Sequence, residues 1–210
     1  MRAINRRAIH GDFELVNDSN WSEVAKRALG RGIFPHELSG LLEFPLRRFI
    51  LSPPVLASRL SLRPDFSVLE IGCGSGYYGL EVAKCLLSGH LKLFDIQPEM
   101  IQKCIRRVAA SGLRNVSFAT GDGAALPFTD AQFDLVYMVT VLGEVRDREA
   151  CLKSIRRVLR PGGLLSISEH LPDPDFISIA ALARMTRPFG FRLERRCGPR
   201  MAYTANFRAE

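Results

Sequence analysis

From residue 66 onward, short apolar runs rich in β-branched and aromatic residues alternate with longer segments whose apolar positions recur every three or four residues. The first pattern predicts strands, and the second predicts amphipathic helices. We predict strands over residues 66–71, 91–95, 116–119, 133–139 and 164–168, and helices over 77–87, 98–112 and 144–159. Strands and helices that alternate in this way indicate a parallel sheet with helices on both faces.

The C-terminal end of the chain has a different pattern. Apolar residues mostly alternate with polar ones over 191–197 and 201–207, on either side of Gly198–Pro199. Two strands joined by so short a connection must be antiparallel. We therefore predict an α/β fold, a Rossmann-like seven-stranded sheet with a parallel core, a C-terminal antiparallel hairpin and helices on both faces.

The N-terminal residues show no clear strand. Helical spacing predicts a helix over residues 21–29, residues 41–51 are strongly apolar, and Pro53–Pro54 marks a break before the next element. We interpret residues 1–60 as an N-terminal helical cap and residues 61–210 as the main domain.

The composition is that of an ordinary globular protein, with 47% hydrophobic and 24% charged residues among 210. The apolar runs are too short for a membrane-spanning helix, and the basic N-terminus lacks the apolar core of a secretory signal, so we expect a cytoplasmic protein. The five cysteines and four histidines are scattered. This dispersion predicts reduced thiols and no metal site.

The net charge of +7 is unevenly distributed. Residues 1–60 hold nine basic and six acidic residues, and residues 171–210 hold seven and four, whereas thirteen and twelve nearly cancel over residues 61–170. The basic excess at both ends of the chain could serve solubility alone, or it could bind nucleic acid, anionic lipid or an acidic small molecule.

A glycine-rich loop follows the first predicted strand and opens a helix, in the sequence Glu70-Ile-Gly-Cys-Gly-Ser-Gly76. Such a loop lets the backbone turn tightly and approach a ligand closely, while the helix N-terminus presents free N–H groups. The dinucleotide fingerprint requires a third glycine three residues after the second, where this chain has Tyr77. The spacing therefore argues against a dinucleotide site.

Residues 66–170 resemble the class I S-adenosylmethionine-dependent methyltransferases, of the type 11-like small-molecule group that includes quinone-biosynthesis methyltransferases. Five motifs fall in that family's order, namely Val68–Gly76, Asp95–Ile96, Gly121–Gly123, Leu126–Phe128 with Phe133–Asp134, and Leu159–Gly163. The resemblance implies S-adenosylmethionine as cofactor and S-adenosylhomocysteine as product.

The resemblance also implies roles for individual residues. The loop residues Gly72, Cys73, Gly74 and Gly76 would line the methionine and ribose parts of the cofactor, and Glu70 would anchor the loop and face the methionine ammonium.

Other implied contacts lie at the ends of the later strands. Asp95 would accept hydrogen bonds from both ribose hydroxyls, Ile96 would pack on the adenine, and Asp122 beside Gly123 would accept from the adenine amino group. Val139, which ends the fourth strand, completes the set. Asp95 and Asp122 could instead cap the helices that follow them.

The acceptor is expected near the carboxyl ends of strands four and five. His170 and Glu144 are the candidate bases there, although His170 also fits a partly exposed residue at a strand end and Glu144 the first turn of its helix. Tyr77 and Tyr203 could line the acceptor pocket or simply pack. We assign no catalytic residue, because methyl transfer requires a base only for a protonated acceptor.

We therefore predict a methyltransferase that acts on a small, apolar or amphipathic molecule. The Asn/Asp-Pro-Pro-aromatic motif of base and glutamine methylation is absent after strand four, so we do not expect a nucleic-acid partner. The pair Arg47–Arg48, within an apolar segment, is compatible with peripheral contact between the protein and a membrane. The alternatives are an RNA or protein methyltransferase that uses the basic terminal segments, and a non-catalytic S-adenosylmethionine-binding protein.

Overall fold

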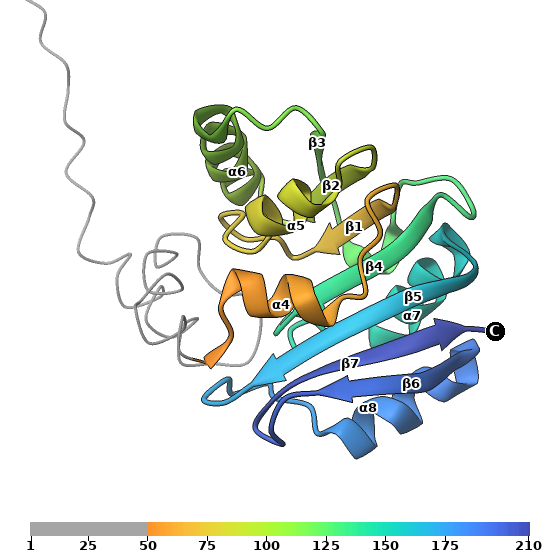
Figure 1. The fold of residues 1–210 in the computed structure, drawn as a ribbon. Coiled ribbons are helices and arrows are strands. Elements are labelled where there is room, and N and C mark those ends of the chain that lie inside the picture. Colours follow the sequence, from red (N-terminus) through yellow and green to blue (C-terminus); the bar gives the residue numbers. More distant parts are fainter. Residues whose placement is uncertain (1–49) are drawn as a thin grey trace, which may run out of the picture.

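The computed structural model describes residues 50–210, which form one mixed sheet with helices on both faces (Figure 1). The seven strands are β1 (Ser67–Ile71), β2 (His90–Asp95), β3 (Val116–Thr120), β4 (Phe133–Val139), β5 (Leu159–His170), β6 (Phe191–Cys197) and β7 (Ala202–Ala209). Their order is β3-β2-β1-β4-β5-β7-β6. The first five strands pair in parallel and β7 pairs antiparallel to both β5 and β6. The predicted fold is confirmed.

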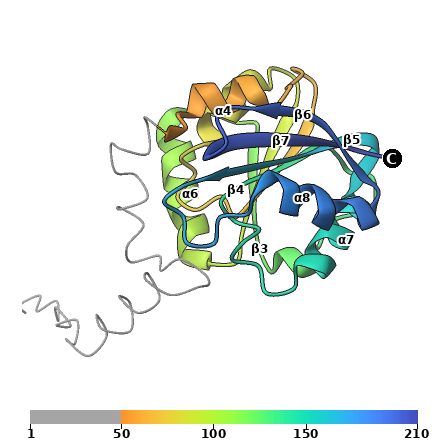
Figure 2. The same ribbon diagram turned by 90° about the horizontal axis from the view of Figure 1, so that it is seen from below.

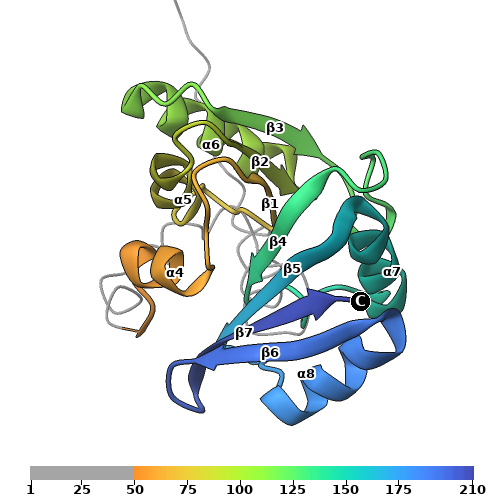
Figure 3. The same ribbon diagram turned by 45° about the vertical axis from the view of Figure 1, so that its right-hand side comes forward.

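The helices cover the two faces of the sheet separately, as Figure 3 shows. They are α4 (Pro53–Arg59), α5 (Gly79–Cys85), α6 (Pro98–Ser111), α7 (Arg148–Val158) and α8 (Ile179–Thr186), with 3₁₀ turns at Gly123–Ala125 and Arg187–Phe189. Helices α4, α5 and α6 bury Leu56, Val82 and Cys104 in the core on one face. Helices α7 and α8 bury Leu152 and Leu182 in the core on the other face (Figure 2).

Local sequence signals set several of the helix boundaries. Gly112 ends α6 with a positive φ of 73°, a conformation that glycine adopts without steric cost. The side chain of Asp147 accepts a hydrogen bond from the Ala150 amide at the start of α7, and the side chain of Ser178 caps α8 in the same way.

Several predicted boundaries differ from the structure, and one helix is missing from the prediction. Pro53–Pro54 begins α4 instead of breaking the chain, because proline lacks only an N–H that the first helical turn leaves unpaired. Helix α7 begins at Arg148, and Glu144 lies in the preceding turn. Helix α8 was not predicted from the short apolar run Ile179–Ala183; its buried Leu182 packs on the sheet.

The predicted helix over residues 21–29, the apolar residues 41–49 and the Arg47–Arg48 pair lie outside the described residues. The helical cap over residues 1–60 therefore stays a prediction. Within residues 50–210, no helix has the length and apolar character needed to cross a membrane.

Candidate functional site

The carboxyl ends of β1, β2 and β4 surround a cavity of about 330 Å³. This size lies in the range of small-molecule sites. The cavity lies where the strand order reverses, with β2 on one side of β1 and β4 on the other. Loops that leave neighbouring strands in opposite directions open a crevice at such a point, so the topology itself creates the site.

The loop after β1 forms one wall of the cavity. Gly72 and Gly74 both have positive φ, +70° and +53°, which L side chains rarely adopt. A Cβ at Gly72 would lie 2.4 Å from a methyl of Val141, whereas one at Gly74 would meet nothing within 4 Å. Backbone hydrogen bonds from Gly72 and Cys73 to the carbonyl of Phe94 attach the loop to β2. The glycines thus let the backbone pass close to the cavity.

Asp95 lies at the end of β2 and joins that strand to the glycine loop. Its Oδ2 accepts from the amide of Gly74 at 2.8 Å, and its Oδ1 accepts from the amide of Gln97 at 3.0 Å. Burial raises the pKa of this carboxyl, while the hydrogen bonds from Gln97, Gly74 and Ile96 act in the opposite direction. Each carboxylate oxygen has two lone pairs, so Asp95 keeps acceptor capacity toward the cavity.

Ile96 contributes an apolar surface beside that carboxyl. Its side chain is 43% exposed although it lines the cavity. An exposed branched side chain next to a carboxyl acceptor suits a ligand that presents a hydroxylated ring and a flat apolar ring together.

Glu70 lies deeper in the cavity wall, on β1. Its side chain is buried, and its Oε2 accepts a hydrogen bond from the Tyr137 hydroxyl at 2.7 Å. Burial, followed by the nearby Glu70, raises the pKa of Tyr137 well above its ordinary value. Tyr137 therefore stays protonated and holds the Glu70 carboxyl in place.

Asp122 and Gly123 line the cavity from the loop after β3. Asp122 is exposed, and its Oδ1 accepts from the Ala124 amide at 2.9 Å, so it caps the short turn that follows. Both sequence interpretations of Asp122 are compatible with this geometry, because the capping bond leaves its other oxygen available.

Two thiols lie behind the loop. The Sγ atoms of Cys73 and Cys104 are 3.6 Å apart, and the hydrogen bond with Cys104, followed by burial, raises the pKa of Cys73 well above its ordinary value. Gly76 does not line the cavity. A Cβ there would lie 3.0 Å from the Cys104 Sγ, so Gly76 permits the loop to pack on α6.

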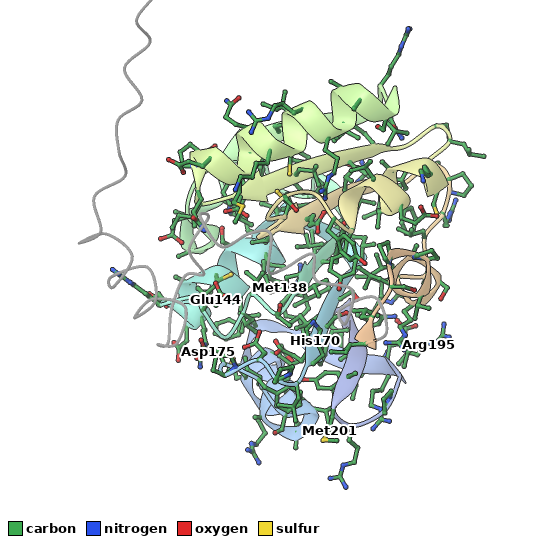
Figure 4. All side chains as sticks on the ribbon, turned by 90° about the vertical axis from the view of Figure 1, so that its left-hand side faces the viewer. Met138, Glu144, His170, Asp175, Arg195 and Met201 are labelled. Atoms are coloured by element: carbon green, nitrogen blue, oxygen red, sulfur yellow. The ribbon has the colours of Figure 1, made fainter. Side chains whose placement is uncertain are left out.

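The end of β4 forms the remaining wall. Val139 lines the cavity together with residues that we did not assign from the sequence, among them Val141, Val145 and Arg146. Val141 carries no recognisable motif; only its contact with Gly72 identifies it. Glu144 also lines this wall, and Figure 4 shows it after the end of β4.

Of the other residues that the sequence suggested for the acceptor side, only one lines the cavity. Tyr77 lines the cavity, whereas His170 and Tyr203 do not. The Tyr203 hydroxyl donates to the Ile177 carbonyl, and its ring packs against Phe176. His170 is buried at the end of β5 (Figure 4), not partly exposed as one interpretation of it required.

Glu169, which we did not single out, is a buried acid beside His170. Its Oε2 accepts from the Ile177 amide at 3.4 Å, and its Oε1 has no hydrogen-bond partner among the described residues. Burial raises its pKa from 4.5 to about 8, so the carboxyl is largely protonated at neutral pH.

The cavity fits S-adenosylmethionine in size and in its polar groups. Nine of the ten residues predicted to bind the cofactor line it, with Gly76 the exception. The buried Asp95 carboxyl suits the ribose diol, the exposed Ile96 side chain suits an adenine ring, and the open side of Gly74 leaves room for a ligand against the backbone.

Comparison with known proteins agrees with this geometry. A family model described as a methyltransferase domain matches residues 62–187. An O-methyltransferase of Pyrenophora dematioidea is 30% identical over 152 residues, which cover 69% of this chain and 55% of the relative. The sterol 24-C-methyltransferase ERG6B of Gibberella zeae is 31% identical over 117 residues, covering 55% of this chain and 30% of the relative. The chain therefore spans about half or less of these two relatives.

Among solved structures, a SAM-dependent methyltransferase from Aquifex aeolicus superimposes with a TM-score of 0.78 at 21% identity. The match covers 85% of this chain and 100% of that one. At this level of identity the likeness concerns the fold.

Proposed function

The chain belongs to the class I S-adenosylmethionine-dependent methyltransferases, and on that premise we propose that it transfers a methyl group to a small, apolar or amphipathic molecule. S-adenosylmethionine supplies a methyl group already activated on a sulfonium. The protein then has to bind the cofactor, align the acceptor and exclude water.

The contacts in the cavity wall support the cofactor-binding roles that we propose for individual residues. Asp95 accepts hydrogen bonds from the ribose hydroxyls while its bond to Gly74 holds the loop in place. Ile96 packs on the adenine, and the free acceptor capacity of Asp122 serves the adenine amino group. Glu70, oriented by Tyr137, faces the methionine ammonium.

The observation that supports an apolar acceptor is the wall at the end of β4. Val139, Val141 and Val145 line the cavity there, alongside the charged Glu144 and Arg146, and Tyr77 lines the cavity as well. Apolar side chains bind an acceptor by removing its surface from water, and they offer little to a strongly polar one. The relatives named for O-methylation and for sterol C-methylation fit an acceptor of this class.

The division of the chain into two parts also belongs to the proposal. We propose that residues 1–60 cap the acceptor side of the cavity and that residues 61–210 are the methyltransferase domain. We also propose that the protein is cytoplasmic and that its acceptor is a small molecule.

Calorimetry with S-adenosylhomocysteine tests the cofactor-binding part directly. The protein should bind S-adenosylhomocysteine and not NADP, and the Asp95→Ala variant should lose most of the affinity. Equal binding of NADP, or unchanged affinity in the Asp95 variant, would place the cofactor elsewhere. Transfer of labelled methyl into an organic-solvent extract tests the acceptor class.

A further inference from the structure

The turn between β6 and β7 lies at the same edge of the sheet as the cavity. Strand β7 runs antiparallel to β5, with His170 paired to Ala202, so the turn stands beside the carboxyl end of β5. The amide of Leu171 donates to the carbonyl of Met201 at 2.9 Å, which joins the loop after β5 to this turn. We call Leu171, Arg195, Arg196, Arg200 and Met201 the hairpin tip.

The hairpin tip exposes apolar side chains. Met201 is 63% exposed and Leu171 is 41% exposed, and these two residues are neighbours through their backbone hydrogen bond. Met201 lies at the margin of the molecule in Figure 4. Together they present a small apolar surface at this turn.

Three arginines lie on the C-terminal part of β6 and in the turn, without ion pairs to other described residues. Arg195, Arg196 and Arg200 are exposed, and only Arg196 has a side-chain hydrogen bond, to the Gly198 carbonyl. By contrast, the arginines farther from the turn are neutralised, since Arg192 pairs with Glu210 and Arg208 pairs with Glu194. Within the β6–β7 hairpin, the arginines without an ion pair are therefore the ones nearer the turn.

The nearest acid in sequence to Leu171 does not cancel this charge fully. Asp173 is half-buried, and its Oδ1 accepts from the amide of Asp175 at 2.8 Å. One carboxylate oxygen is thus engaged within its own loop. The three guanidinium groups outnumber it at the surface.

We propose that the hairpin tip docks on an anionic lipid bilayer, with Met201 and Leu171 entering the headgroup region and the three arginines contacting lipid phosphates. Arginine forms paired hydrogen bonds with phosphate, and an anionic surface attracts each such charge by about 1 kcal/mol. This docking would hold the acceptor edge of the sheet against the membrane. It extends the proposed function, since a lipid-soluble acceptor would then reach the cavity from the bilayer.

The exposed side chains favour lipid over RNA as the partner. Within residues 50–210, the large exposed apolar side chains are aliphatic or methionine, and none is aromatic. Single-stranded nucleic acid is typically bound by aromatic side chains that stack on its bases. A surface of arginine, leucine and methionine suits an acyl and phosphate interface better.

Flotation of the full chain with vesicles tests the proposal without acceptor or turnover, so its outcome is independent of the proposed reaction. Vesicles of phosphatidylcholine alone are compared with vesicles that also contain phosphatidylglycerol. The protein should bind the second kind only, and R195Q/R196Q/R200Q should weaken binding on the order of 100-fold, since three charges are removed. Met201→Asp should weaken it as well.

The control R106Q/R114Q/K153Q removes the same charge from exposed residues away from the tip and should bind like the parent. If this control loses as much vesicle binding as the tip variant, binding depends only on the net charge of the protein, and the proposal is overturned. Full binding by the tip variant, or loss of binding only in R47Q/R48Q, would overturn it as well. Retention on RNA with a steep salt dependence, without vesicle binding, would show a nucleic-acid surface instead.

Discussion

Asp95 accepts a hydrogen bond from the backbone amide of Gly74 at 2.8 Å, so the carboxyl at the end of β2 fixes the loop at the end of β1. The same carboxyl lines the cavity. One side chain therefore shapes the loop and presents acceptor oxygens to the cavity. Because the loop is held by the protein itself, little ordering is left for the cofactor to impose on binding.

Replacement of Asp95 should separate these two roles. In Asp95→Asn, one acceptor oxygen remains and the volume is nearly unchanged, so we expect S-adenosylhomocysteine to bind about 10–100-fold more weakly, the equivalent of one or two charge-assisted hydrogen bonds. Asp95→Ala should also lower the Tm, because the Gly74 and Gln97 amides lose their acceptor. Calorimetry and thermal unfolding measure the two effects. Wild-type affinity in Asp95→Asn would contradict a contact between this carboxyl and the ribose.

Gly72 and Gly74 differ in what a methyl group would meet. Both have positive φ, so Gly74→Ala should destabilise the fold by about 1–2 kcal/mol through backbone strain alone. Gly72→Ala should cost more, because its Cβ would overlap Val141.

Denaturant unfolding of G72A, G74A and each combined with V141A checks this difference. V141A removes the two methyls nearest the new Cβ, and it should recover part of the stability of G72A while leaving G74A unimproved. Equal responses of the two glycine variants to V141A would contradict the packing argument.

Ile96 should affect affinity without affecting stability. Its side chain is 43% exposed and so contributes little to the core, and Ile96→Ala should leave the Tm nearly unchanged. It should weaken S-adenosylhomocysteine binding roughly 10-fold, as expected for lost apolar contact with the adenine. Ile105→Ala is the matched control, because Ile105 is also an exposed isoleucine, 37% accessible, and does not line the cavity. Similar affinities in the two variants would contradict the adenine contact.

Glu169 should make stability depend on pH. Its pKa is about 8 in the folded protein, against an ordinary value of 4.5, so between these values the folded state retains a proton that the unfolded state has lost. Stability must then fall as pH rises through this window, by several kcal/mol in total, and level off above it. Asp173, Arg148 and Glu144 are the charged groups that act on this carboxyl.

The Tm of Glu169→Gln should change less between about pH 5 and pH 9 than that of the parent, and should exceed it at the alkaline end. Glu99→Gln, at an exposed position, should leave the pH dependence unaltered. A parent-like pH dependence in Glu169→Gln would show that another group titrates.

The fold was largely predictable because periodicity records which faces of an element are buried. The exceptions have local physical causes. Helix α8 has only eight residues, too few for its period to be distinguished from an apolar run. The sequence analysis interprets Pro53–Pro54 as a break between elements, whereas these residues begin helix α4, because proline is tolerated in the first turn of a helix.

Most residues predicted from the sequence to bind the cofactor line the cavity, whereas Val141 in its wall and the buried Glu169 were not singled out from the sequence. Asp95 and the loop glycines have fixed positions along the chain, because a turn and a strand end require these residue types there. Val141 and Glu169 act through contacts made only in the folded chain. Val141 lies against Gly72, which is far away in the sequence, and Glu169 accepts a hydrogen bond from Ile177, which belongs to no recognisable motif. No local sequence pattern therefore identifies Val141 or Glu169.

Transfer of labelled methyl from S-adenosylmethionine into a cell extract, separated afterwards into organic-soluble, polar small-molecule, RNA and protein pools, tests the central claim most directly. Label should accumulate in the organic-soluble pool with the parent protein and should be strongly reduced with Asp95→Ala. Label in the RNA or protein pool, or no transfer by a protein that binds S-adenosylhomocysteine, would contradict the proposed acceptor class or the activity itself.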